Sequence, residues 1–310
     1  MYSESATNLL DLPKADVQQW LKTFDAVLTD CDGVLWHDNQ PITGSSKVTA
    51  ALQLLGKRVY FVTNNGTKTR HALWQRACAL GYEIKEENIL APTSSIVDYL
   101  QNRNFQQTVY VIGATSITEE LTAAGIKHTG AGVDVLDINV NDYIERELAI
   151  ADPNVGAVVV GFDEHFSFGK VMKASNYLGS NEHCLFLATN ADAVHRYPEY
   201  AIPGTGAILK AVETCVGRDA LVLGKPNAVI CEALLNSGTL VPERTLMVGD
   251  CPKVDVTFGK NCGFQTLLVG TGGTKLADVL KMRINLPENR QYIPDVYIEK
   301  LGDLLKFIEI

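Results

Sequence analysis

Four short polar segments, each directly after an apolar run, contain residue types that can bind or attack phosphate. We call these segments polar corners. The first is Asp30-Cys31-Asp32-Gly33, in which two carboxylates stand two positions apart directly after the apolar run 26–29. Carboxylates this close repel each other unless a cation lies beside them. A hard divalent ion such as Mg²⁺ prefers oxygen ligands, and the glycine lets the chain turn with its amides exposed toward an anion. An ordinary acidic turn after a strand is the alternative reading.

Two further corners supply a hydroxyl and a lysine. Thr63-Asn64-Asn65 closes a second apolar run, and its threonine can donate to a phosphate oxygen, although Asn-Gly is also a common turn. Lys225 follows a later run after one glycine. A lysine delivered there supplies a point charge for phosphate, unless it is simply a solvated surface lysine.

The fourth corner is acidic again. Asp250 closes the run 246–248 after one glycine, and Asp255 follows five residues later. A carboxylate at this place completes a metal site with the first corner, or it caps a helix. Acid pair, hydroxyl, lysine and acid each close an apolar run in that order, which makes the set more informative than any single member.

Short apolar runs alternate with amphipathic segments along most of the chain, and they must position these corners. We expect buried strands at 26–29, 59–63, 109–112, 157–160, 185–188, 221–223, 246–248 and 266–269, and helices at 45–55, 69–80, 117–124, 207–215 and 229–235. Continuous apolar strands separated by helices predict an α/β fold with parallel sheet covered on both faces. Ligands bind such sheets at the carboxyl ends of the strands, where the corners lie.

Composition narrows the classes of function. The 310 residues are 46% hydrophobic with a formal charge of −9, which argues against a general nucleic-acid surface. The seven cysteines are scattered without a CxxC pair, so neither a disulfide framework nor a zinc knuckle is expected. No apolar stretch approaches the roughly 18 residues of a membrane span, and the start lacks a secretory pattern, so we expect a cytoplasmic protein without membrane partners.

The order and flanks of the corners resemble the four signature motifs of the haloacid dehalogenase superfamily, which read DxDG, Thr or Ser, Lys and GDxxxxD. Further stretches resemble the 4-nitrophenylphosphatase group, which includes phosphoglycolate phosphatase and pyridoxal phosphate phosphatase. These stretches are 30–36, 63–65, 160–166, 189–192, 203–206 and 224–226. The likeness covers nearly the whole chain.

This resemblance implies a doubly wound, Rossmann-like parallel-sheet core with a large α/β cap inserted between the second and third motifs. The core would comprise residues 1–103 and 204–310, and the cap residues 104–203. Pairing of caps into a homodimer is common in similar proteins, and the sequence does not test it.

The resemblance also implies a mechanism for hydrolysis of a small-molecule phosphomonoester. Asp30 would attack phosphorus, and Asp32 would protonate the leaving alcohol and then activate water. The carboxylates of Asp30 and Asp250 and the backbone carbonyl of Asp32 would hold Mg²⁺, while Lys225 and Thr63 would hold the other phosphate oxygens. Behind these groups, the second acid of the fourth motif, Asp255, would support the lysine or the waters on the metal.

Residues expected to contact substrate come from two places. Asn64 and Asn65 follow the second motif, and Asn190 and Asp192 match the TNxD pattern of the substrate-facing loop of the cap. His195 can hydrogen-bond a pyridine or a carboxylate, or can be an exposed loop histidine. The substrate stays open between 2-phosphoglycolate, pyridoxal 5'-phosphate and a phosphoprotein.

The fourth motif departs from the family pattern, since Cys251-Pro252-Lys253-Val254 replaces the usual Arg-Leu, acidic residue and Thr. The proline fits the first turn of a helix, and the lysine predicts looser Mg²⁺ binding. The altered motif leaves open a catalytically weak paralogue that binds phosphorylated ligands. Independently of that motif, the same core could serve a phosphotransferase. Cys31 is expected to be a packed side chain with a raised thiol pKa, not a redox switch.

Overall fold

The computed structural model describes residues 6–134, 136–149, 152–196, 199–275, 277–279 and 291–309. The chain divides into two compact units, one comprising 1–63, 71–90 and 225–310, the other 64–70 and 91–224. The second unit is wider than the insertion predicted at 104–203, and the role of that insertion as a cap stays a prediction. No helix among the described residues is long and apolar enough to cross a membrane.

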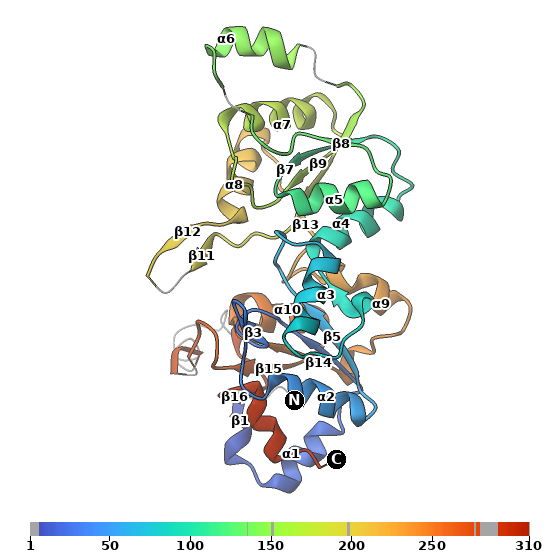
Figure 1. Ribbon diagram of the computed structural model, residues 1–310, viewed down its shortest axis with the longest axis vertical. Helices are drawn as coiled ribbons and strands as arrows, with labels where there is room; N and C mark the ends of the chain where they lie inside the picture. The colour runs from blue at the N-terminus through green and yellow to red at the C-terminus, as the bar shows by residue number, and fades with distance from the viewer. Residues whose placement is uncertain are drawn as a thin grey trace. The chain divides into compact units, whose positions relative to one another are not determined.

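The first unit is built on a seven-stranded sheet whose recorded pairings are all parallel (Figure 1). Its strand order is β1–β16–β15–β14–β2–β5–β6. These strands are β1 (Thr7–Asn8), β2 (Ala26–Thr29), β5 (Arg58–Val62), β6 (Ile89–Leu90), β14 (Thr245–Gly249), β15 (Gln265–Val269) and β16 (Val296–Ile298). A two-stranded hairpin follows β2 and consists of β3 (Trp36–His37) and β4 (Gln40–Pro41).

Helices of the first unit cover this sheet. They include α1 (Lys14–Leu21), α2 (Ser45–Leu54), α3 (Arg70–Ala79, starting at the unit boundary), α9 (Glu232–Asn236), α10 (Thr257–Asn261), the 3₁₀ turns Leu9–Asp11, Glu86–Asn88, Ala228–Cys231, Pro242–Arg244 and Leu301–Lys306, and one turn of π-helix at Pro252–Val256. Ala26 and Leu28 pack with Phe258 on one face of the sheet. Val27 is also buried, and successive strand residues point to opposite faces. Both faces are therefore covered, which explains the continuous apolar strands.

The second unit has its own parallel sheet, with strand order β13–β10–β9–β7–β8. The strands are β7 (Thr108–Ile112), β8 (His128–Thr129), β9 (Val155–Val160), β10 (Leu185–Ala188) and β13 (Leu221–Val222), with an antiparallel hairpin of β11 (Val194–Arg196) and β12 (Ala201–Pro203). The helices are α4 (Pro92–Gln101), α5 (Thr115–Ala123), α6 (Val140–Tyr143), α7 (Phe168–Ser180) and α8 (Thr205–Val216), with a π-helical turn at Ile144–Leu148. Residues of α7 and α8 pack on β9 and β10 through one apolar cluster.

The α/β fold class with parallel sheets is confirmed, and each predicted strand and helix has a counterpart within a few residues. One strand lies in an unexpected place. The run 221–223 forms β13 beside β10 in the sheet of the second unit, although it leads directly to Lys225 of the first unit. An apolar run shows that a strand is buried but not which sheet buries it.

Candidate active site

Three of the polar corners follow neighbouring strands of the first unit. Cα pairing aligns the ends of β14, β2 and β5, so Asp250, Asp30 and Thr63 leave the same edge of the sheet. The backbone N–H of Asp30 donates to the carbonyl of Val248 at 2.8 Å, and that of Thr63 donates to Leu90 at 3.1 Å. The sheet itself thus fixes where these side chains begin.

Lys225 joins this edge as a buried cation. Its Nζ lies 2.6 Å from Oδ1 of Asp30, 2.8 Å from Oδ1 of Asp255 and 3.1 Å from the carbonyl of Val62. Burial alone would lower the pKa of Lys225, but Asp255 and Asp30 hold that pKa above its usual value. The ammonium therefore stays charged, and the alternative of a solvated surface lysine is wrong.

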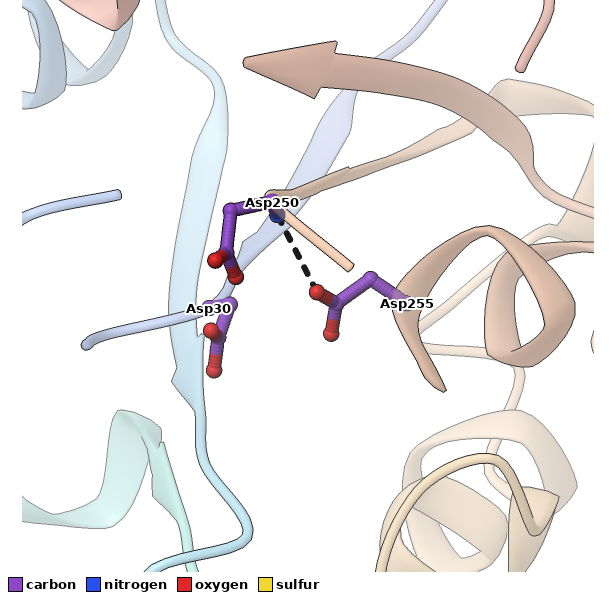
Figure 2. A group of neighbouring side chains, drawn as sticks. All are labelled: Asp30, Asp250 and Asp255. Atoms are coloured by element: carbon purple, nitrogen blue, oxygen red, sulfur yellow. Dashed lines mark hydrogen bonds between the residues drawn. The ribbon is translucent and has the colours of Figure 1, made fainter. Parts of the chain in front are cut away.

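The carboxylates of Asp30, Asp250 and Asp255 lie close together (Figure 2). One ligand oxygen from each of Asp30, Asp250 and Asp255 lies within 4.8 Å of the others. Burial raises the pKa of Asp30 well above its usual range against the pull of Lys225, and burial with the charge of Asp255 raises the pKa of Asp250 to about 6. When all three carboxylates are ionised, they exceed the single charge of Lys225 by about two negative charges, and a divalent cation with oxygen ligands would balance this excess. The residues present therefore fit Mg²⁺.

Asp255 is tied to its neighbours through both oxygens. Its Oδ1 faces Lys225, and its Oδ2 accepts the backbone N–H groups of Asp250 at 3.1 Å and of Cys251 at 3.0 Å. Figure 2 shows the Asp255 side chain reaching toward the backbone of Asp250. With its oxygens committed in this way, Asp255 orients the site.

Two glycines leave room for the carboxylate of Asp250. A Cβ on Gly33, whose φ is +89°, would lie 2.8 Å from Oδ2 of Asp250, and a Cβ on Gly272 would lie 1.7 Å from the same atom. The sequence predicts Gly33 only as a turn residue and does not single out Gly272. The signal available was the glycine pair that follows the last long strand.

Asp32 has a different environment from Asp30. Its side chain is 49% exposed, whereas that of Asp30 is 12% exposed. The indole N–H of Trp36 donates to Oδ1 of Asp32 at 3.0 Å. Cys31, between the two acids, is buried, and burial followed by the charges of both acids raises its thiol pKa well above the usual value. The expectation of a packed side chain with a raised thiol pKa at this position is confirmed.

A second group of expected site residues lies together within the second unit. The side chain of Asn190 donates to the backbone carbonyl of Asn64 at 2.9 Å, and Asn64 Nδ2 donates to Oδ2 of Asp192 at 3.3 Å. The backbone N–H of Asp192 in turn donates to Oδ1 of Asn190 at 3.1 Å. Residues far apart in sequence therefore form one polar cluster.

The remaining two expected residues of this unit are held separately. Asn65 accepts the backbone N–H and the hydroxyl of Thr67 in a local turn. His195, on β11, packs its ring edge-on against Phe162 at 5.3 Å between centroids. Its Nε2 is buried without a hydrogen-bond partner among the residues that the structure describes. This nitrogen is an unused polar group of the kind that a ligand can satisfy.

The departure in the fourth motif preserves the backbone that the site needs. Pro252 begins the helical turn Pro252–Val256, with Cys251 as its N-cap, so the expected fit of proline to a first helical turn is confirmed. Lys253 is exposed to solvent on this turn. Its predicted weakening of Mg²⁺ binding stays a prediction.

The chain is similar in sequence to known hydrolases over most of its length. A family model described as haloacid dehalogenase-like hydrolase matches residues 27–127, and a HAD-hydrolase-like model matches residues 222–304. The glycerol-3-phosphate phosphatase of Gallus gallus is 37% identical over 296 residues, covering 93% of this chain and 93% of that protein. The chain belongs to the haloacid dehalogenase-like hydrolases. The resemblance drawn from its motifs is confirmed.

Two further matches within this family agree. The chloroplastic phosphoglycolate phosphatase 1A of Arabidopsis thaliana is 34% identical over 296 residues, covering 94% of this chain and 79% of that protein. The structure of the p-nitrophenyl phosphatase from Archaeoglobus fulgidus superposes with a TM-score of 0.75 at 29% identity, covering 91% of this chain and 98% of that one. The predicted enzyme class, a phosphatase, is confirmed.

Proposed function

We propose that this hydrolase is a Mg²⁺-dependent phosphomonoesterase that forms an aspartyl-phosphate on Asp30. The contact of Lys225 with Asp30 inside a cluster of three carboxylates is the observation that carries the proposal. A buried lysine beside a buried carboxylate, at the carboxyl edge of a parallel sheet, is an arrangement suited to receive a phosphate group.

The nucleophile needs positioning more than activation. A carboxylate is a nucleophile once ionised, and its difficulty is the approach to a dianionic phosphate. Lys225, which contacts Asp30, would neutralise part of that charge, and Thr63, which follows the neighbouring strand β5, would donate to a phosphate oxygen. The carboxylates of Asp30 and Asp250 and the backbone carbonyl of Asp32 would hold Mg²⁺, which when bound supplies the positive charge that the site lacks.

Asp32 would then carry the proton. As Asp30 bonds to phosphorus, the bond from phosphorus to the ester oxygen breaks, and protonated Asp32 gives its proton to that oxygen. The resulting Asp32 carboxylate next removes a proton from the water that attacks the phosphorus of the aspartyl-phosphate, and the bond between phosphorus and the Asp30 oxygen breaks. Inorganic phosphate leaves, and both aspartates return to their starting states. The side chain of Asp32 is half-exposed, so it is accessible for proton transfer to the leaving group and from water.

The proposed substrate is a small phosphorylated metabolite. The named relatives support glycerol 3-phosphate and 2-phosphoglycolate, and the motif resemblance adds pyridoxal 5'-phosphate. The cluster of Asn64, Asn190 and Asp192, with His195, would contact the leaving group. The unsatisfied His195 Nε2 suits either a carboxylate or a pyridine nitrogen.

The test is hydrolysis of 4-nitrophenyl phosphate and of the three metabolites, with Mg²⁺ and with excess chelator. We expect activity that requires Mg²⁺, and a loss in Asp30→Asn of more than about a thousandfold. Asp25→Asn, an exposed acid paired with Arg244, is the matched control and should retain activity. Full activity in Asp30→Asn would refute the nucleophile assignment. Transfer of phosphate to an added alcohol in preference to water would establish a phosphotransferase instead.

A further inference from the structure

Arg76 reaches the first motif from a distant element. It lies on α3, and its Nη1 is 3.9 Å from Oδ1 of Asp32. Its guanidinium carbon is 5.2 Å from the centre of the Trp36 ring, and its Nη2 donates to the backbone carbonyl of Asp38 in the turn between β3 and β4. One side chain therefore contacts the acid, the ring beside it and the hairpin that follows.

Two donors, the cationic guanidinium of Arg76 and the neutral indole N–H of Trp36, approach the same oxygen of Asp32. The indole N–H of Trp36 is 3.0 Å from Oδ1, and Nη1 of Arg76 approaches that atom from α3. Trp36 is buried and its ring packs edge-on against Phe61 and Tyr82, at 6.2 and 5.6 Å between centroids. The indole donor is therefore fixed by the core and cannot follow a moving carboxylate.

The guanidinium of Arg76 is partly buried, which lowers the stability of the protein in a way that an exposed arginine does not. The side chain of Arg76 is 22% exposed, and its Nε is buried without a hydrogen-bond partner among the described residues. A buried donor left without a partner lowers stability, so packing alone does not favour an arginine here. A lysine would supply one point charge, whereas the planar fork of arginine contacts Asp32, Trp36 and Asp38 together.

We propose that Arg76 is a positioning residue for the acid–base step, holding Oδ1 of Asp32 against Trp36 so that Oδ2 is presented to the ester oxygen and then to water. This inference rests on the proposed function, because it assigns Asp32 the proton transfer. Arg76 contacts neither the phosphate-binding lysine nor the nucleophile in any recorded interaction among the described residues, so its effect should be confined to that step.

The leaving group separates this role from a general structural one. The 4-nitrophenolate ion is a stable anion that departs without receiving a proton, whereas the alkoxide of an alkyl phosphate needs the proton from Asp32. Misplacing Asp32 should therefore slow alkyl phosphate hydrolysis and leave 4-nitrophenyl phosphate hydrolysis nearly unchanged. A variant that merely weakens the fold would slow both substrates equally.

The experiment measures kcat/KM for 4-nitrophenyl phosphate and for the faster of glycerol 3-phosphate and 2-phosphoglycolate, in the full chain with Mg²⁺. The variants are Arg76→Met, which keeps an unbranched apolar stem, and Trp36→Phe, which keeps a ring but removes the N–H donor. Asp32→Asn is the reference for complete loss of the acid. Arg58→Met is the charge-matched control, because Arg58 is exposed at the opposite end of β5.

We expect Arg76→Met to lower kcat/KM for the alkyl phosphate by about tenfold or more relative to 4-nitrophenyl phosphate, with Trp36→Phe changing the ratio in the same direction. Arg58→Met should leave the ratio unchanged. Equal losses on both substrates in Arg76→Met, or no loss on either, would overturn the inference while leaving the proposed function intact. A missing leaving-group effect in Asp32→Asn would instead refute the acid–base assignment itself.

Discussion

Asp255 divides its two carboxylate oxygens between the ammonium of Lys225 and the backbone N–H of Asp250. The first contact is 2.8 Å and the second 3.1 Å. One side chain thereby fixes the cation that faces the nucleophile and the backbone of a proposed metal ligand. This relationship explains why an acid is needed five residues after Asp250, and why a helical turn must begin between them.

Replacing Asp255 by Asn should test this arrangement. The amide has nearly the same size, but it is neutral and one of its two polar ends is a donor. It cannot stabilise Lys225 and accept two backbone N–H groups at once. We expect kcat/KM for 4-nitrophenyl phosphate to fall by about 10–100-fold, with a higher Mg²⁺ concentration for half-maximal activity. If Asp255→Asn needs the same Mg²⁺ concentration for half-maximal activity as the control Asp25→Asn, this prediction is wrong.

Gly272 and Gly273 form a matched pair for testing the room around Asp250. A Cβ at position 272 would lie 1.7 Å from Oδ2 of Asp250, whereas a Cβ at position 273 would meet no atom within 4 Å. Gly272→Ala should therefore displace Asp250 and reduce Mg²⁺-dependent hydrolysis by about tenfold or more. Gly273→Ala should retain activity. Equal activities in the two variants would show that the carboxylate of Asp250 can move without consequence.

Three of the four polar corners are predictable from the sequence because the strands before them, β2, β5 and β14, are buried on both faces. Such strands read as unbroken apolar runs, and the polar residue that ends each run lies at the ligand edge. Asp30, Thr63 and Asp250 were located in this way, and the pairing of their strands places them together. Lys225 also follows an apolar run, but the sequence does not show that this run, β13, pairs within the sheet of the second unit.

Other parts of the site leave no periodic signal. Arg76 lies on a helix with mixed polar residues, and nothing local to α3 indicates that it faces Asp32. The glycine pair 272–273 is visible in the sequence, but only the close approach of Asp250 in the structure distinguishes Gly272 from Gly273. Two-residue strands such as β6 are also too short for an alternating pattern, and their pairing is set by the neighbouring strand.

The second unit contains a buried ion pair whose disruption should lower stability. Lys170 Nζ lies 2.5 Å from Oδ2 of Asp163, and the two side chains are 0% and 2% exposed. Lys170→Met leaves the carboxylate buried without its partner, which costs about 3–5 kcal/mol. Urea unfolding followed by circular dichroism should show this loss. Lys14→Met, which breaks an exposed pair with Glu309, should give a much smaller change.

The double variant Lys170→Met/Asp163→Asn tests whether the unpaired carboxylate of Asp163 causes the loss of stability. Removing the stranded charge should recover a large part of the stability lost in Lys170→Met. If the double variant is as unstable as the single one, the cost comes from packing around position 170 and not from an unpaired carboxylate.

Tyr82 should make the stability of the folded protein depend on pH in the alkaline range. Its hydroxyl donates to the carbonyl of Leu35 beneath the first motif and lies 2.6 Å from Oγ of Ser45. Burial raises the pKa of Tyr82 to about 12 from the usual 10.0, against the effect of Ser45. A raised folded-state pKa means that the unfolded chain loses this proton first. The contribution of Tyr82 to stability is therefore complete below pH 10 and decreases as the pH rises toward about 12.

Tyr82→Phe isolates that contribution, because lysines and other tyrosines titrate in the same range in both proteins. We expect the stability advantage of the native protein over Tyr82→Phe to be constant below about pH 10 and to shrink between about pH 10 and 12. Urea unfolding at a series of pH values measures the difference. Absorbance titration of tyrosinate should show one fewer late-titrating group in the variant. A difference that stays constant throughout that range would mean that Tyr82 ionises in the folded protein as readily as in the unfolded chain.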